Sequence, residues 1–176
     1  MIFCSIIIPF QNSQKTIIKC LQSIKNQIGK IDYEVILIDD FSKDNTKKKI
    51  RPFLKYNNFK LTKSKKKTFG PGYARNLGIN IARGNYIYFL DSDDELRRDA
   101  LISLFKIIST NKNIDIVFNN FKIDDLVGNL KKKDRSDLNL LKKNKTLVLK
   151  NFFQLSIIPQ AISNLIKKKL IKKNKI

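Results

Sequence analysis

Short apolar runs alternate with amphipathic stretches along much of the chain. Four runs, at positions 3–8, 34–38, 59–62 and 86–90, are rich in β-branched or aromatic residues, which predicts buried strands. Between and after them, apolar residues recur at helical spacing, which predicts helices at 17–28, 44–55, 71–82 and 99–109. Strands that alternate with helices in this way predict an α/β domain with a largely parallel sheet.

Polar residues mark the expected limits of the first two helices. Asn12 or Ser13 is expected to cap the first helix, because their side chains accept hydrogen bonds from free helix N–H groups. Gly29 is expected to end that helix. Ser42 and Asp44 offer caps for the second, lysine-rich helix.

The pattern becomes less regular after position 110. A further strand is predicted at 114–119, a hairpin turn at 127–129, a charged loop at 131–145 and a helix at 147–156.

A basic amphipathic helix is predicted from Ile162 onward. Its apolar residues share one helical face backed by lysines: Leu165, Ile166, Leu170 and Ile171. Two interpretations remain open, namely contact with an anionic membrane surface, or packing on the protein with a solvated lysine face.

Polar residues also follow three of the predicted strands. Asn12 lies just after the first strand, Asp39 and Asp40 follow the second, and the acidic stretch 91–94 follows the fourth. Ligands bind at the carboxyl ends of the strands in parallel sheets. We therefore expect these three segments to converge on one crevice.

The composition adds a large positive charge. Lysine and arginine number 36 against 15 acidic residues, which gives a net charge of +21. Such a charge suits nucleic acid, an anionic membrane or phosphate-bearing substrates, but it also arises from a lysine-rich codon bias with solvated lysines. The lysines are dispersed and the aromatic residues fall in apolar runs, so we expect no nucleic-acid partner.

Cysteine and histidine usage narrows the chemistry. Cys4 and Cys20 lie in apolar segments and form no C-x-x-C pair, so we expect small buried side chains in a reducing, cytoplasmic setting. The chain has no histidine, which excludes serine–histidine and cysteine–histidine catalysis within these residues. No apolar stretch reaches membrane-spanning length, and no signal peptide is predicted at the N-terminus.

The acidic stretch after the fourth strand is the strongest chemical signal. Asp91, Asp93, Asp94 and Glu95 place four carboxylates within five residues, and these repel one another unless a cation lies among them. A hard divalent cation, Mg²⁺ or Mn²⁺, takes such oxygen ligands and shares itself with substrate phosphates. The alternative is that Asp93 and Asp94 cap the following helix.

Three blocks of sequence stand out in the first part of the chain: SIIIPFQNSQKTIIKCLQSIKNQ, YEVILIDDFSKDNT and GPGYARNLGINIARGNYIYFLDSDDEL. In their residues, order and spacing, these blocks resemble family 2 inverting glycosyltransferases of the GT-A fold. The resemblance implies a Rossmann-like α/β/α sandwich. It also implies transfer of a sugar from a nucleotide diphosphate donor, in polysaccharide biosynthesis, to a glycan or lipid-linked acceptor.

The resemblance also implies roles for single residues. Asp40 would bind the nucleotide base, usually uracil, and Asp39 would support that loop. Arg75 would approach the diphosphate, as a cation near phosphates should. Asp91 and Asp93 form the D-x-D motif that holds Mn²⁺ or Mg²⁺, with Asp93 the more direct ligand. The remaining implied nucleotide contacts are Pro9, Phe10, Asn12 and Ser92.

Two departures from the family pattern limit these expectations. Gln11 stands where an aromatic residue often precedes the asparagine, so stacking on the base would be weaker or would come from Phe10. The segment from Ile162 resembles the part of the family just before an acidic block that carries the general base. Four earlier aspartates do not match that block: Asp124, Asp125, Asp134 and Asp137.

The resemblance therefore divides the chain into two parts. Residues 1–125 are expected to form the nucleotide-sugar-binding core, and residues 126–176 the basic start of an acceptor-side region that ends short. The general base is expected beyond residue 176, so the chain alone would bind donor with weak or absent transfer. Peripheral contact with the inner face of the cell membrane remains open.

Other nucleotide-binding classes fit less well. A nucleotide-binding α/β protein without transferase activity remains the main alternative. Gly70 and Gly72 precede a helix as in dinucleotide-binding oxidoreductases, but Arg75 stands where a third glycine belongs. Paired acids after a strand also suggest a phosphoacceptor domain, although the long acidic cluster does not.

Overall fold

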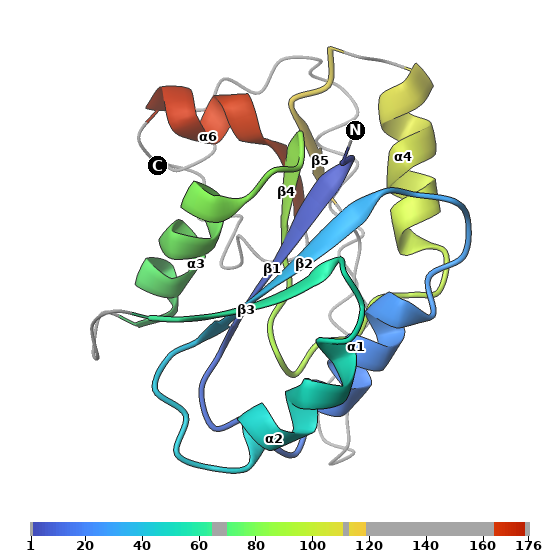
Figure 1. The fold of residues 1–176 in the computed structure, drawn as a ribbon. Coiled ribbons are helices and arrows are strands. Elements are labelled where there is room, and N and C mark those ends of the chain that lie inside the picture. The colour runs from blue at the N-terminus through green and yellow to red at the C-terminus, as the bar shows by residue number, and fades with distance from the viewer. Residues whose placement is uncertain (1, 65–69, 111–112, 119–163, 175–176) are drawn as a thin grey trace, which may run out of the picture.

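A single six-stranded sheet forms the centre of the molecule. The computed structural model describes residues 2–64, 70–110, 113–118 and 164–174 (Figure 1). Within them the strand order is β3-β2-β1-β4-β6-β5. The strands are β1 (Cys4–Phe10), β2 (Tyr33–Asp39), β3 (Phe59–Lys63), β4 (Tyr86–Phe89), β5 (Ile116–Phe118) and β6 (Asn164–Lys167). The first four strands are parallel, and β6 pairs antiparallel with both β4 and β5.

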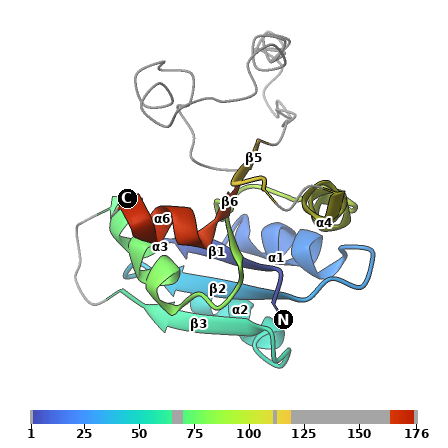
Figure 2. The ribbon, with the colours of Figure 1, turned by 90° about the horizontal axis from the view of Figure 1, so that it is seen from above.

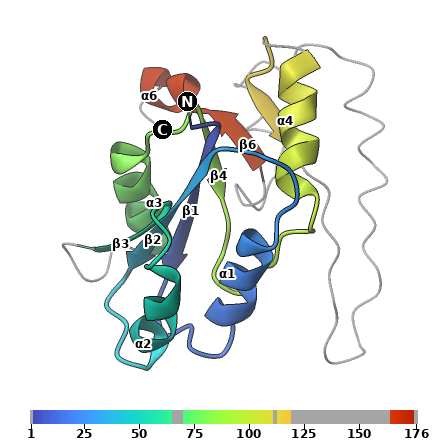
Figure 3. The same ribbon diagram turned by 45° about the vertical axis from the view of Figure 1, so that its right-hand side comes forward.

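Helices cover both faces of this sheet (Figures 2 and 3). Buried residues of α1 (Ile17–Lys25), α2 (Thr46–Ile50), the 3₁₀ turn η1 (Arg51–Phe53) and α4 (Ala100–Thr110) pack in one core cluster. Those of α3 (Gly70–Ile81) and α6 (Lys168–Asn174) pack in another, on the opposite face. The predicted α/β/α sandwich with a mostly parallel sheet is therefore confirmed.

Alternating side chains of the buried strands supply the two clusters. In β1, Ile6 and Ile8 point to the α1 face and Ile7 to the α3 face, and none is exposed to solvent. Both cysteines are free and fully buried, as predicted. Burial, and to a smaller extent the charge of Glu34, raises the pKa of the Cys4 thiol to about 12. Among the described residues, no helix is long and apolar enough to span a bilayer.

A buried polar network ties the amino ends of three strands together. The Glu34 side chain is 1% exposed, and its Oε1 accepts hydrogen bonds from the Ser5 hydroxyl at 2.8 Å and the Arg83 N–H at 2.5 Å. Its Oε2 lies 3.2 Å from Lys60 Nζ. The Ser5 hydroxyl in turn accepts the Gly84 N–H at 2.8 Å. Each group in this network has a partner, which offsets the cost of burying the charge.

The predicted helix from Ile162 is wrong at its start. Residues Asn164–Lys167 form β6, and the helix α6 begins only at Lys168. Leu165 pairs with Tyr88 of β4 and with Val117 of β5, so neighbours distant in sequence decide its conformation. Helical spacing within a short segment cannot reveal such pairing. The hairpin turn, the charged loop and the helix predicted at 127–156 lie outside the described residues.

The predicted helix limits also need correction. The helix α1 begins at Ile17, so neither Asn12 nor Ser13 caps it, and the Ser13 carbonyl accepts the Ile17 N–H at 3.0 Å instead. It ends at Lys25, before Gly29. The helix α2 gives way to a 3₁₀ turn at Arg51, because the following proline cannot continue the helical bonding. Asp44 still bonds the Thr46 N–H at 3.0 Å.

Candidate functional site

Three loops meet at the carboxyl end of the sheet. Strand β1 lies between β2 and β4 and is parallel to both. The Asp40 N–H donates to the Phe10 carbonyl at 2.8 Å, and the Asn12 N–H donates to the Ser42 hydroxyl at 3.1 Å. The hydroxyls of Ser13 and Ser92 lie 2.8 Å apart. The predicted convergence of the three strand ends is therefore confirmed.

An open polar cavity of about 440 Å³ lies between the loops after β1 and β4. It is lined by Gln11, Asn12, Ser13, Gln14, Lys15, Thr16, Ser92 and Asp93. Amide, hydroxyl and charged groups thus converge on a concave surface, which is typical of a ligand site.

The two acids after β2 differ in their surroundings. The Asp39 side chain is 2% exposed, and its carboxylate accepts the Ser42 N–H at 2.8 Å and lies 3.5 Å from Lys47 Nζ. Asp39 therefore orders the loop. Asp40 is partly exposed, and within the described part of the chain no hydrogen bond or ion pair engages its carboxylate. Asp40 can accept hydrogen bonds from a ligand.

Pro9 and Phe10 are both buried. The Phe10 side chain is 3% exposed and packs in the core cluster on the α1 face. Its backbone carbonyl, rather than its ring, contacts the loop after β2, where it accepts the Asp40 N–H. The aromatic surface that the sequence suggested at Phe10 thus belongs to the core.

The loops after β1 and β2 contain two left-handed residues. Asn12 has a φ of 50° and Phe41 a φ of 60°. Asparagine tolerates this region, and its Oδ1 accepts the Lys43 N–H at 2.9 Å. A bulky residue there costs about 1–2 kcal/mol, and such strain concentrates at binding sites. Sequence reasoning missed Phe41, because nothing in the sequence reveals a positive φ at a phenylalanine.

Arg75 of α3 reaches across the α3 face of the sheet to Asp91. The Arg75 Nη2 donates to Asp91 Oδ1 at 2.7 Å, with the side chains 19% and 30% exposed. Within the described part of the chain, no group accepts a hydrogen bond from the buried Arg75 Nε. The backbone carbonyl of Asp91 accepts the thiol of Cys20, with a sulfur–oxygen distance of 3.6 Å. The structure therefore brings Arg75 to the acidic cluster, and its contact with a diphosphate stays a prediction.

Negative charge accumulates along the loop at 91–95. Desolvation raises the pKa of the Asp94 carboxyl above its ordinary value, and the neighbouring charges of Asp93 and Asp91 raise it further. Burial also raises the pKa of the Cys20 thiol, and the charges of the same cluster add to that effect. The helix α4 begins only at Ala100, so the idea that Asp93 and Asp94 cap it is wrong.

The cluster fits a cation that is shared with a substrate. Among the described residues, no three or more histidine, cysteine or acidic side chains are grouped as a complete metal site. Asp91 and Asp93 offer two carboxylates next to the polar cavity. Mg²⁺ is commonly bound by one or two carboxylates and completes its shell with phosphates and water. The residues present fit that mode of binding.

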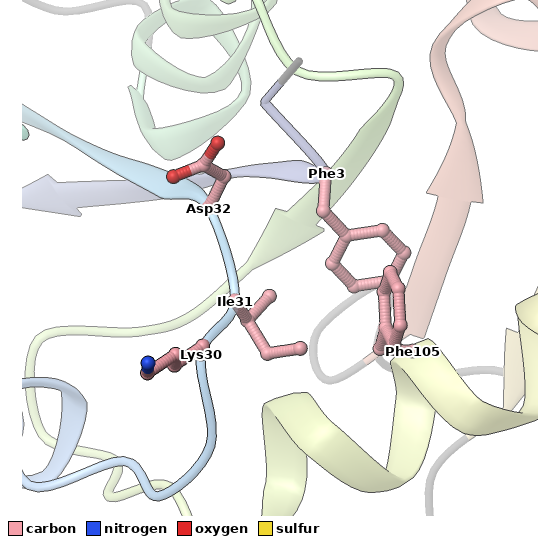
Figure 4. A pocket seen from close by; sticks show the side chains of 5 residues that line it. All are labelled: Phe3, Lys30, Ile31, Asp32 and Phe105. Atoms are coloured by element: carbon pink, nitrogen blue, oxygen red, sulfur yellow. The ribbon is translucent and has the colours of Figure 1, made fainter.

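A second cavity, of about 450 Å³, lies at the amino end of the sheet (Figure 4). The rings of Phe3 and Phe105 meet edge to face with centroids 5.2 Å apart, and Ile31 points toward them. The side chains of Lys30 and Asp32 extend away from the rings. Because its polar groups diverge, this cavity is the weaker candidate for a ligand site.

Comparison with known proteins relates residues 5–173 to the family described as glycosyl transferase family 2. The chain is 31% identical over 176 residues to the poly(ribitol-phosphate) beta-N-acetylglucosaminyltransferase TarP of Staphylococcus aureus, covering 98% of this chain and 51% of TarP. It is 36% identical over 129 residues to a GalNAc(5)-diNAcBac-PP-undecaprenol beta-1,3-glucosyltransferase of Campylobacter jejuni, covering 73% of this chain and 40% of that protein.

The fold is likewise that of a known structure. TarS of S. aureus (residues 1–349), crystallised with UDP-GlcNAc, superposes with a TM-score of 0.76 and 25% identity, covering 100% of this chain and 48% of that one. These similarities confirm the resemblance to family 2 glycosyltransferases and the GT-A fold. The chain spans about half the length, or less, of these relatives.

Proposed function

Because this chain belongs to glycosyl transferase family 2, we propose that it forms the donor-binding part of an enzyme that transfers a sugar from a UDP-sugar. One observation carries the proposal. The loops after β1, β2 and β4 meet at the carboxyl end of the sheet, where a polar cavity lies between the first and the third. These loops carry the partly exposed carboxylate of Asp40 and the acidic stretch 91–95, to which Arg75 is bound. A nucleoside diphosphate needs a partner for its base, its phosphates and its charge, and we assign these groups to those roles.

Asp40 is assigned to the base. Its carboxylate is partly exposed and can accept the N–H of a uracil ring. Asp39 holds the same loop through the Ser42 N–H and Lys47, so the position of Asp40 is fixed before the ligand arrives. Asn12 and Ser92 line the polar cavity. Pro9 and Phe10 are assigned a supporting role, since both are buried and the Phe10 carbonyl accepts the Asp40 N–H.

Asp91 and Asp93 are assigned to a divalent cation, Mn²⁺ or Mg²⁺, with Asp93 as the more direct ligand. When bound, such a cation neutralises the diphosphate as it leaves the sugar. Asp93 is exposed at the cavity wall, and the charge of the cluster, which raises the pKa of Asp94, favours a cation there. Arg75 contributes a second positive charge for the phosphates.

The acceptor and the general base are assigned outside the donor core of residues 1–125. Two relatives act on poly(ribitol-phosphate) and on an undecaprenol-linked glycan, so a glycan or lipid-linked acceptor in surface polysaccharide biosynthesis is the proposal for this chain. Most of residues 126–176 lie outside the described residues.

We infer a cytoplasmic enzyme that meets such acceptors at the inner face of the membrane. Ile171 of α6 is 5% exposed and packs in the core cluster with α3, so its apolar face is already covered. Any contact of α6 with anionic lipid would therefore be made by its lysines, and would weaken with salt.

Calorimetric titration of UDP, with and without Mn²⁺, tests this proposal. We expect Mn²⁺-dependent binding that Asp93→Asn weakens at least tenfold, because the substitution removes a charged metal ligand. Asp115→Asn is the matched control, since Asp115 pairs with Lys167 at the amino end of β5. Tighter binding of GDP or TDP would overturn the assignment to UDP, and a folded chain that binds no nucleotide would overturn the function.

A further inference from the structure

The proposed function gives Arg75 and Asp91 different partners, yet the structure joins them to each other. Arg75 is assigned to the diphosphate and Asp91 to the cation. Arg75 Nη2 lies 2.7 Å from Asp91 Oδ1 in a partly buried ion pair. While that ion pair persists, the guanidinium cannot turn fully to a phosphate. The Asp91 carboxylate is then bound to Arg75 instead of to a metal ion.

The pair leaves both partners incompletely satisfied. The Arg75 Nε is buried and finds no acceptor among the residues that the structure describes, which is an unfavourable state for a charged group. Asp91 lies beside Asp93 and Asp94, whose charges a single guanidinium offsets only in part. A diphosphate offers a guanidinium a bidentate partner, and a divalent cation offers the cluster twice the charge.

We propose that the Arg75 guanidinium is a placeholder for the metal at Asp91. When the cation and the diphosphate bind, the guanidinium moves from Asp91 to the phosphates. The inference rests on the proposed function. In the free protein the guanidinium neutralises Asp91 and keeps the acidic loop in place. When nucleotide and metal arrive together, the ion pair opens, Asp91 becomes available to the cation, and Arg75 bonds the diphosphate.

The exchange makes the two ligands cooperative. Metal alone must displace Arg75 and leave its charge without a partner, so it binds weakly. Nucleotide alone must draw Arg75 away and expose Asp91 to the charges of Asp93 and Asp94. Each ligand thus removes the free-energy cost of opening the Arg75–Asp91 pair for the other ligand. By linkage, each raises the affinity of the other by the same factor. We expect at least a tenfold coupling between UDP and Mn²⁺.

Arg75→Gln separates the placeholder from a simple phosphate contact. Manganese binding without nucleotide, followed by the electron paramagnetic resonance of free Mn²⁺, should become at least threefold tighter, because the competing guanidinium is gone. Binding of UDP in the presence of Mn²⁺ should become at least tenfold weaker. A residue that only maintains the fold would weaken both, and a plain phosphate contact would leave the affinity for metal alone unchanged.

Two further variants complete the experiment. Asp91→Asn frees Arg75 and should strengthen UDP binding without metal about threefold, while reducing the enhancement by Mn²⁺. Arg51→Gln removes the same charge from the exposed turn η1, and should leave both affinities unchanged. Unaltered Mn²⁺ affinity in Arg75→Gln, with no coupling in the wild type, would overturn the placeholder alone. Absence of UDP binding to the wild type would instead overturn the proposed function.

Discussion

Acidic side chains have opposite surroundings at the two ends of the sheet. At the amino end, Glu34 is 1% exposed and surrounded by donors from Ser5, Lys60 and Arg83. Burial alone would raise the pKa of its carboxyl, but these hydrogen bonds and the charge of Lys60 bring it below its ordinary value. At the carboxyl end, desolvation, followed by the charges of Asp93 and Asp91, raises the pKa of Asp94.

The contrast separates charge that stabilises the fold from charge that we assign to ligand binding. Around Glu34 every acid–donor contact is made within the protein, so folding itself supplies the favourable interaction. The loop at 91–95 concentrates carboxylates, of which Asp93, Asp94 and Glu95 are exposed, and their mutual repulsion costs stability. Substitutions at the two ends should therefore have opposite effects on stability.

The largest effect is expected for Glu34→Ala. The variant leaves the buried Ser5 hydroxyl and the Arg83 N–H without their acceptor, and each unsatisfied group of this kind costs about 1–3 kcal/mol. Lys60 is 39% exposed and can turn to water, so its loss adds little. Urea unfolding followed by circular dichroism measures the loss. Asp93→Asn is the matched control from the other end, where we expect a change within about 0.5 kcal/mol. A loss below 1 kcal/mol for Glu34→Ala would show that the network contributes little.

Gly84→Ala should disturb the same network by a steric clash with the backbone of β1. A Cβ at this position would lie 2.5 Å from Ser5 N and 2.6 Å from Cys4 C, and these main-chain atoms belong to the central strand. We expect a loss of about 2–3 kcal/mol, because such a clash can be relieved only by moving β1. Gly72→Ala, whose Cβ would meet nothing within 4 Å, should be nearly neutral by the same unfolding assay. Equal losses in the two variants would contradict the steric argument.

The sequence predicts the carboxyl end of the sheet better than the amino end. Short, continuous segments such as 86–95 contain both a strand and the acids that follow it, so local pattern places Asp91 and Asp93 at a strand end. The Glu34 network joins residues that lie 29, 26 and 49 positions apart, and no local pattern connects them.

The errors have the same origin. Strand β6 takes its conformation from β4 and β5, which are far from it in the chain, so a helical pattern at Leu165 and Ile166 was misleading. The left-handed backbone of Phe41 follows from loop contacts on either side, where Asp40 and Ser42 bond the loop after β1. The positive φ of Phe41 therefore depends on tertiary contacts.

The third prediction concerns the pH dependence of stability. The folded-state pKa of Glu34 is below its unfolded value, so its contribution is fully present above the unfolded pKa of about 4.3 and is lost as the pH falls through the folded value. The difference in unfolding free energy between wild type and Glu34→Gln should be constant from about pH 7 to 5.5 and shrink below about pH 4. A difference that grows on acidification would contradict the assigned direction.

The smallest effect, and of opposite sign, is expected for Asp94→Asn. Removing this charge relieves its repulsion with Asp91 and Asp93, while the turn is kept by the Asp94 N–H, which donates to the Asp91 carbonyl at 3.1 Å. Because the side chain is exposed, solvent screening limits the gain to about 0.3–0.5 kcal/mol. Urea unfolding at low ionic strength should show it, and 0.5 M salt should remove it, since surface repulsion is screened over a few ångströms. Destabilisation that salt does not alter would mean that the Asp94 carboxylate has a structural role like that of Glu34, and the contrast between the two ends would then be restricted to Asp91 and Asp93.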